Sequence, residues 1–249
     1  MAQSAVGLTT TDTDLDLHYL KGELCRIDVL IQREIVSWQL AGQDPRDAFR
    51  GLHLSDGEIA QLLARPFGAS WGQLVALAPG EANAFAQARA AVDEEACALS
   101  ERARQRGHVP RLEALAAAFD LDRFDLDTLL ICLAPALDLR YERLYAFLQD
   151  DVTRKRPTIN LVLDLLGDGT PHHRLTLLTR FGDEAPLFRH RFLMRASDSL
   201  ANHTPLLGQA LSIDPALVAW LLGGYQPQES LGAHAEMWDP ATDSADAVL

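Results

Sequence analysis

Lysine is nearly absent from this 249-residue sequence: only Lys21 and Lys155 occur, and arginine carries almost all of the positive charge. A phosphate-binding loop of the Walker type needs glycines whose N–H groups surround the phosphates, and a lysine followed by Ser or Thr. Lys21 is followed by Gly22 and Lys155 by Arg156, so neither can be that lysine. The sequence therefore excludes a Walker site, and we expect no ATP or Mg cofactor in this chain.

Other signatures of chemistry are missing as well. The sequence has no HExxH, CxxC or GxSxG motif. It also has no nucleophilic residue and base at a spacing that would indicate a catalytic pair. His172 and His173 are adjacent, so on one helix they point about 100° apart and do not form a chelating pair. We therefore assign no catalytic, cofactor-binding or metal-binding residue. An enzyme with scattered catalytic residues stays open as an alternative.

Signals for membrane insertion and secretion are also lacking. No run of eighteen apolar residues occurs, and the first residues have no basic start followed by an apolar stretch. The three cysteines, Cys25, Cys97 and Cys132, are far apart and odd in number, which indicates buried free thiols. These features predict a cytoplasmic protein without membrane contact.

Acidic residues outnumber basic residues, 35 to 22, so the formal net charge is -13. A surface that binds phosphates usually carries excess positive charge. The acidic balance therefore argues against a nucleic-acid partner, although a local basic patch would escape this sum.

The sequence does contain long helical patterns in residues 14–107, after a polar tail over residues 1–13. Apolar residues recur at three- and four-residue steps from about Asp14, and they predict one helix of about six turns. These residues are Leu17, Leu20, Leu24, Ile27, Ile31, Ile35 and Trp38. A short helix is expected after Ser55, where Glu58 has capping-box spacing. An alanine-rich helix over 81–106 would complete an antiparallel hairpin.

Residues 108–224 show shorter helices and more turns. We expect helices at 110–118, 124–134, 139–150, 157–166, 171–181 and 214–222. Residues 186–197 and 205–213 each contain a short stretch that can be extended, which would make a small two-stranded ribbon. This order is typical of a winged-helix-like domain, and a plain helical bundle is the alternative. Residues 225–249 carry no Lys or Arg and read as an acidic linker or disordered tail.

Two groups of cations are candidates for contact with a partner. Arg154, Lys155 and Arg156 are consecutive and stand in a loop ahead of a helix start, where they either contact an acidic partner or are simply solvated. Arg189 and Arg191 lie near the expected wing, and wings can touch DNA phosphates.

The segment around Arg189 and Arg191 also has a structural interpretation. His190 and Arg195 belong to the same basic group, which alternates with apolar residues. The alternating residues are Phe188, Phe192 and Leu193. This alternation favours a half-buried amphipathic segment.

Residues 121–166 are the most distinctive part of the chain. Their central string, LLICLAPALDLRYERLYAFLQDDVTRKRPTINLVLDLL, resembles the region that precedes the ATPase core in a group of bacterial AAA+ proteins. Some of these proteins are encoded with phage-tail-like contractile injection systems. The stretches FGDEAPLFRHRFL and PLLGQALSIDPALVAWLLGG fit the same resemblance, which covers about residues 20–224.

The resemblance implies a regulatory region and not the ATPase module itself. The family's ATP-binding, magnesium-binding and arginine-finger residues belong to the module that would follow, so none is carried over to this chain. The implied role is a non-catalytic, protein-binding N-terminal region of an AAA+ ATPase that remodels or assembles protein complexes. Its partner would be another protein or the cognate AAA+ module, through which it would also form oligomers. The alternative is a winged-helix DNA-binding transcriptional regulator.

Overall fold

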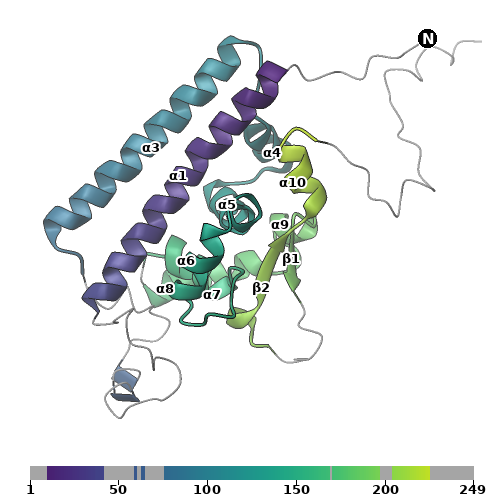
Figure 1. Cartoon of the computed structure of the whole chain (residues 1–249). Helices are drawn as coiled ribbons and strands as arrows, with labels where there is room; N and C mark the ends of the chain where they lie inside the picture. Colours follow the sequence, from purple (N-terminus) through teal and green to yellow (C-terminus); the bar gives the residue numbers. More distant parts are fainter. Residues whose placement is uncertain are drawn as a thin grey trace, which may run out of the picture.

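The described part of the protein is mainly helical and has one small antiparallel sheet (Figure 1). A computed structural model describes residues 10–41, 59–60, 63–64, 76–168, 170–196 and 204–224. The expected short helix after Ser55 lies outside these residues, except that 59–60 and 63–64 are helical. Residues 1–9 of the tail expected over 1–13 and the expected tail over 225–249 also lie outside them, whereas residues 10–13 are helical. Within the described chain, no helix is long and apolar enough to cross a membrane.

Two long helices, α1 (Thr10–Leu40) and α3 (Pro79–Gln105), lie side by side and form the predicted hairpin (Figure 1). The helices approach closely at Gly22, where an added Cβ would stand 3.0 Å from Leu99 Cδ1. The first helix begins at Thr10, earlier than the start expected near Asp14. Its first turn has a tertiary neighbour that the sequence pattern does not reveal: a Cβ added at Gly223 would meet Thr13 at 2.9 Å.

Three further helices follow: α4 (Arg111–Phe119), α5 (Arg123–Leu137) and α6 (Arg140–Leu148). The central helix, α5, begins with a capping box in which Asp122 accepts from the Asp125 N–H and Asp125 accepts from the Asp122 N–H. It continues past the predicted end at 134, with Pro135 in its last turn. Nearly every residue from 125 to 134 is buried, which makes α5 the core helix of the molecule.

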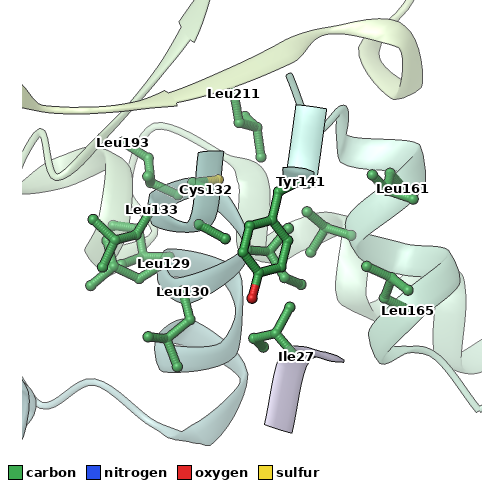
Figure 2. Packing of buried hydrophobic residues seen from close by; sticks show 14 of the residues in the cluster. Ile27, Leu129, Leu130, Cys132, Leu133, Tyr141, Leu161, Leu165, Leu193 and Leu211 are labelled. Atoms are coloured by element: carbon green, nitrogen blue, oxygen red, sulfur yellow. The ribbon is translucent and has the colours of Figure 1, made fainter. Parts of the chain in front are cut away.

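One hydrophobic core joins the hairpin to the rest of the chain. Ile27 on α1 and Leu129 on α5 are both fully buried and belong to the same cluster as Leu211 (Figure 2). Tyr141 lies in the middle of this packing and its hydroxyl donates to Asp28 Oδ1 at 2.8 Å. Burial raises the pKa of Tyr141 to about 12. Residues before and after the expected boundary at 107 therefore share a core.

The predicted ribbon is present and follows a group of short helices. These are α7 (Ile159–Leu166), α8 (Pro171–Leu178), the 3-10 turn η2 (Thr179–Phe181) and α9 (Pro186–Arg189). Strand β1 (Leu193–Ala196) pairs antiparallel with β2 (Ala210–Ile213), with Leu193 opposite Ile213. A 3-10 turn, η3 (Leu206–Gly208), precedes β2, and α10 (Pro215–Leu221) follows it. The start of the 186–197 stretch is thus helical, and only its end is extended.

Candidate functional site

Helices α7 and α8 form a helix-turn-helix unit beside the ribbon. Thr158 caps α7 by accepting from the Leu161 N–H at 3.3 Å, and it also bridges to Ala210 of β2. A short turn that contains Gly167 leads to α8, whose cap is Thr170. In such units the second helix is the one that enters the DNA major groove, so α8 occupies the position of a recognition helix.

The arginines on and after this second helix are paired with acidic or polar residues of the protein. Arg174 on α8 is buried and donates to Asp164 Oδ1 at 2.7 Å and to Asn160 Oδ1 at 2.6 Å, both on α7. Arg180, in the 3-10 turn after α8, contacts Asp122 at 2.8 Å and Asp125 at 2.7 Å. The Arg174 side chain is only 9% exposed, whereas that of Arg180 is 31% exposed but is held by two aspartates.

The carboxylates that bind Arg180 respond differently to their surroundings. Burial alone would raise the pKa of Asp122, but hydrogen bonds from Arg180 and from the Asp125 N–H lower it overall. Burial dominates at Asp125 and raises its pKa in spite of Arg180. Arg180 thus ties the start of α5 to the end of the helix-turn-helix unit.

The outer surface of α8 is neutral and partly apolar. Leu175 is 51% exposed, and His172 and Thr176 are exposed beside it. This surface offers methyl groups and neutral polar groups instead of clustered cations. A face of this composition is suited to contact with another protein.

The first predicted contact group, Arg154 to Arg156, lies in an ordered loop before α7. Gln149 organises this loop, because its Nε2 donates to the carbonyls of Arg154 and Arg156 at 3.0 Å each and its Oε1 accepts from the Thr158 N–H. Two of the cations have carboxylate neighbours: Arg154 with Asp151 at 3.1 Å, and Lys155 with Glu142 at 3.5 Å. All three side chains are exposed, so the loop presents its cations to solvent.

The second predicted group, expected near the wing, lies at the end of α9 and in the turn before β1, ahead of the ribbon. Arg189 and Arg191 are exposed, and Arg191 has a left-handed backbone with φ of 58°. The ring of His190 packs against Phe119, with ring centroids 4.8 Å apart. Arg195 on β1 pairs with Asp183. The segment is thus half-buried and amphipathic, as its alternating sequence indicates.

The ribbon keeps these two groups apart. Residues 154–158 lie beside the start of β2, because Leu211 N–H donates to the Pro157 carbonyl at 2.8 Å. Arg191 precedes Leu193, which pairs with Ile213 at the other end of β2. At 3.3–3.4 Å per residue the two ends of β2 are about 10 Å apart, so the two groups lie at opposite ends of the ribbon.

An open pocket that the sequence patterns did not reveal lies between the hairpin and the helix-turn-helix unit. Its volume is about 420 Å³. Its polar walls come from α1, α3, α5 and the α7–α8 turn, and its apolar lining includes leucines of α1, α7 and α8. The cationic lining residues are Arg26, Arg33, Arg89, Arg123 and His173, and the acidic ones are Asp127 and Asp168. Within the described chain, no group of three or more His, Cys, Asp or Glu side chains could hold a metal ion.

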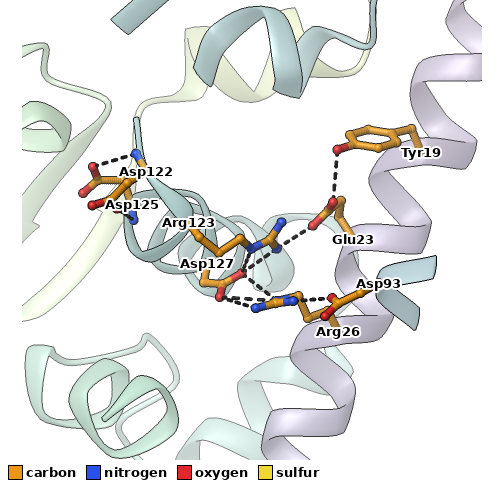
Figure 3. A network of polar contacts seen from close by, with 8 residues as sticks. All are labelled: Tyr19, Glu23, Arg26, Asp93, Asp122, Arg123, Asp125 and Asp127. Carbon is orange, nitrogen blue, oxygen red and sulfur yellow. Dashed lines mark hydrogen bonds and ion pairs between the residues drawn. The ribbon is translucent and has the colours of Figure 1, made fainter. Parts of the chain in front are cut away.

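Three lining residues, Arg26, Arg123 and Asp127, belong to a network of ion pairs (Figure 3). Asp127 on α5 accepts from Arg26 of α1 at 3.1 Å and from Arg123 at 2.6 Å. Arg123 also contacts Glu23 at 2.5 Å, and Arg26 also pairs with Asp93 of α3. Three helices are therefore joined by one set of charges.

The partner charges, and not burial, keep this network ionised. Burial alone would lower the pKa of Arg123, but the hydrogen bond to Glu23 and the charge of Asp127 raise it overall. The sequence carried a signal for this network: Glu23 and Arg26 are charged residues on the same helical face as Tyr19 and Leu30. A charged residue on a buried face needs a partner of opposite charge. The sequence pattern predicts that such a partner exists but does not show which residue it is.

Comparison with known families agrees with this architecture. A family model described as "Winged helix domain, variant" matches residues 14–235. The chain belongs to this winged-helix family, and the match begins in the hairpin, whose first helix shares the core. No curated protein and no solved structure matched the chain.

Proposed function

We propose that this winged-helix chain is a protein-interaction and regulatory region that acts by contact and not by catalysis. The observation that carries the proposal is the surface of α8. The second helix of the helix-turn-helix unit uses Arg174 internally and exposes Leu175. Readout of DNA needs side chains that reach phosphates and base edges, and mostly Arg or Lys supply them.

We further propose that the partner is the ATPase module of an AAA+ protein that remodels or assembles protein complexes, including proteins of contractile injection systems. Support for this finer statement comes from the resemblance of residues 121–166. Residues of that stretch build α5, α6 and α7, which fill the centre of the core. The α8 surface is displayed by this core, and a rigid helix is a suitable element to hold a protein contact.

Site-specific photo-crosslinking in cells that contain the whole protein tests this proposal. The photoreactive residue p-benzoylphenylalanine replaces Leu175 on α8 in one variant and Arg102, an exposed residue on α3, in the control. We expect adducts with an AAA+ ATPase module at position 175 and none at position 102. Nucleic-acid adducts at position 175, or equal protein adducts at both positions, would overturn the proposal.

The DNA-binding regulator remains the second candidate because the family and the helix-turn-helix unit are compatible with it. Its phosphate contacts would have to come from Arg189, Arg191 and the loop at 154–156, since Arg174 and Arg180 are engaged internally. Such binding would weaken steeply as salt is added.

A further inference from the structure

The pocket between the hairpin and the helix-turn-helix unit has the chemistry of a specific binding site. We propose that it binds an acidic peptide segment of the protein partner, in which a carboxylate side chain is flanked by aliphatic residues. This inference rests on the proposed function, because it assumes that the chain works by contact with a protein. It adds a second contact, away from the outer face of α8.

The register of the hairpin places two arginines together in this pocket. Arg26 on α1 contacts Asp93 on α3. Because the helices are antiparallel, Leu30, one turn after Arg26 on α1, lies opposite Arg89, one turn before Asp93 on α3. Arg33 follows on α1, and both Arg33 and Arg89 line the pocket.

These two arginines carry charges that nothing in the described chain neutralises by an ion pair. Arg33 is half-buried, and its Nη2 donates to the carbonyl of Leu165 at 3.2 Å. Arg89 is exposed and has no hydrogen bond or ion pair with any residue that the structure describes. A carboxylate accepts paired N–H donors from guanidinium groups better than from an ammonium group.

The acids of the pocket are already engaged elsewhere. Asp127 accepts from Arg26 and Arg123. Asp168 accepts from both the N–H and the hydroxyl of Thr170 at 2.8 Å each, and it pairs with His173 at 3.1 Å. Hydrogen bonds from Thr170 lower the pKa of Asp168, so it stays ionised in that turn. The aspartates therefore hold the walls in place and leave Arg33 and Arg89 to an incoming anion.

The apolar lining explains why the ligand should be a peptide and not a bare anion. Leu166, Leu177 and Phe124 are half-buried and leave apolar surface that a ligand can cover, whereas Leu30 and Leu165 are almost fully buried and add little. Covering apolar surface stabilises a complex by about 25 cal/mol per Å² before the costs of association. Acetate or phosphate would leave this apolar surface exposed to water, whereas aliphatic residues beside the carboxylate would cover it.

Arginine side-chain NMR on the full chain tests the proposal directly. The probe is an acetylated and amidated pentapeptide in which glutamate and aspartate alternate with leucine, and its control has glutamine and asparagine in their place. We expect the acidic peptide to shift the Nε–Hε signals of Arg33 and Arg89 in a saturable way. Uncharged peptide, acetate and inorganic phosphate should each bind at least about tenfold more weakly.

Charge-removing variants provide the second readout. Arg33→Gln and Arg89→Gln should each weaken peptide binding at least about fivefold, whereas Arg102→Gln, an exposed change on α3, should leave it unchanged. Thermal unfolding of each variant shows whether the fold is kept. Equal binding by Arg89→Gln and the parent chain, or acetate binding as tightly as the peptide, would overturn the proposal.

The failure of this inference is distinguishable from failure of the proposed function. If the crosslink from position 175 persists unchanged in the Arg33→Gln/Arg89→Gln double variant and the peptide does not bind, the pocket proposal is overturned and the function stands. If the acidic peptide binds but position 175 gives only nucleic-acid adducts, the function is overturned instead.

Discussion

At the scale of single residues, Asp127 is the centre of the polar network between the hairpin and α5. It is 5% exposed and accepts from two arginines on different helices (Figure 3). Asp93 accepts from Arg26 too, but its side chain is 45% exposed. The two aspartates thus share a partner and differ in burial, which makes them a matched pair.

Replacing Asp127 by Asn should be far more damaging than replacing Asp93 by Asn. Loss of one member of a buried charge pair leaves its partner uncompensated and costs about 3 kcal/mol, whereas an exposed pair is worth less than about 1 kcal/mol. Urea unfolding of both variants gives the two free energies. Equal losses would show that the network adds no more than a surface ion pair.

The cysteines allow a chemical test of the same packing. The expectation of buried thiols is right for Cys132 on α5 and wrong for Cys97, which is exposed on α3. Burial raises the pKa of the Cys132 thiol. Because the thiolate is the reactive form, iodoacetamide should modify Cys132 at least about tenfold more slowly than Cys97 in the native chain. Mass spectrometry of the alkylated peptides measures both rates, and denaturant should remove the difference. Comparable native rates would contradict the buried position of α5.

At the scale of elements, local sequence signals predicted the helices well. Thr158 and Asp214 are the caps of α7 and α10, and Pro215 is at the first helical position of α10. The end of α5 was missed because Pro135 removes a backbone donor, whereas the Tyr145 hydroxyl donates to the Ile131 carbonyl that this donor would have reached. Helix α9 was missed because a single helical turn has no period to read.

The pocket could not be predicted in the same way. Arg26 and Asp127 are separated by 101 positions, so their contact depends on the register between α1 and α5. The sequence shows that α1 has charges on its buried face, but only tertiary packing selects their partners. The cations at 154–156 and 189–191 were visible in the sequence, whereas their separation by the ribbon was not.

The loop at 154–156 is held in place by one side chain, that of Gln149 at the C-terminal end of α6. Gln149 makes hydrogen bonds to Arg154, Arg156 and Thr158, so Gln149→Ala should release the loop while the helices remain. We expect amide hydrogen exchange at 153–158 to rise at least about tenfold, because loop amides would then open locally. Gln105→Ala on exposed α3 is the control and should change nothing there. Unchanged exchange in Gln149→Ala would contradict this role.

At the scale of the whole molecule, the hairpin is part of the winged-helix fold. Ile27 on α1 is fully buried in the cluster that contains Leu129 and Leu211 (Figure 2). The antiparallel partner of α1, in contrast, exposes most of its residues. Since α1 closes the core, the chain should unfold in a single transition that includes both parts.

Ile27→Ala should lower the stability of that single transition by about 3 kcal/mol, as expected for a large cavity in a core. Leu17→Ala, on the same helix but 39% exposed, should cost less than about 1 kcal/mol. Far-ultraviolet circular dichroism and tryptophan fluorescence should report the same midpoint for each variant. Two separate transitions, with only one moved by Ile27→Ala, would show that the hairpin has its own core.

The central claim is that this winged-helix chain uses its helix-turn-helix unit for protein contact and not for DNA. The most direct measurement is the fluorescence anisotropy of a labelled random-sequence duplex titrated with the full chain at low salt. The net charge of -13 and the internal pairing of Arg174 and Arg180 predict no saturable complex up to about 10 µM protein. A saturable complex that weakens steeply with added salt, and is lost in Arg189→Gln/Arg191→Gln, would contradict the account.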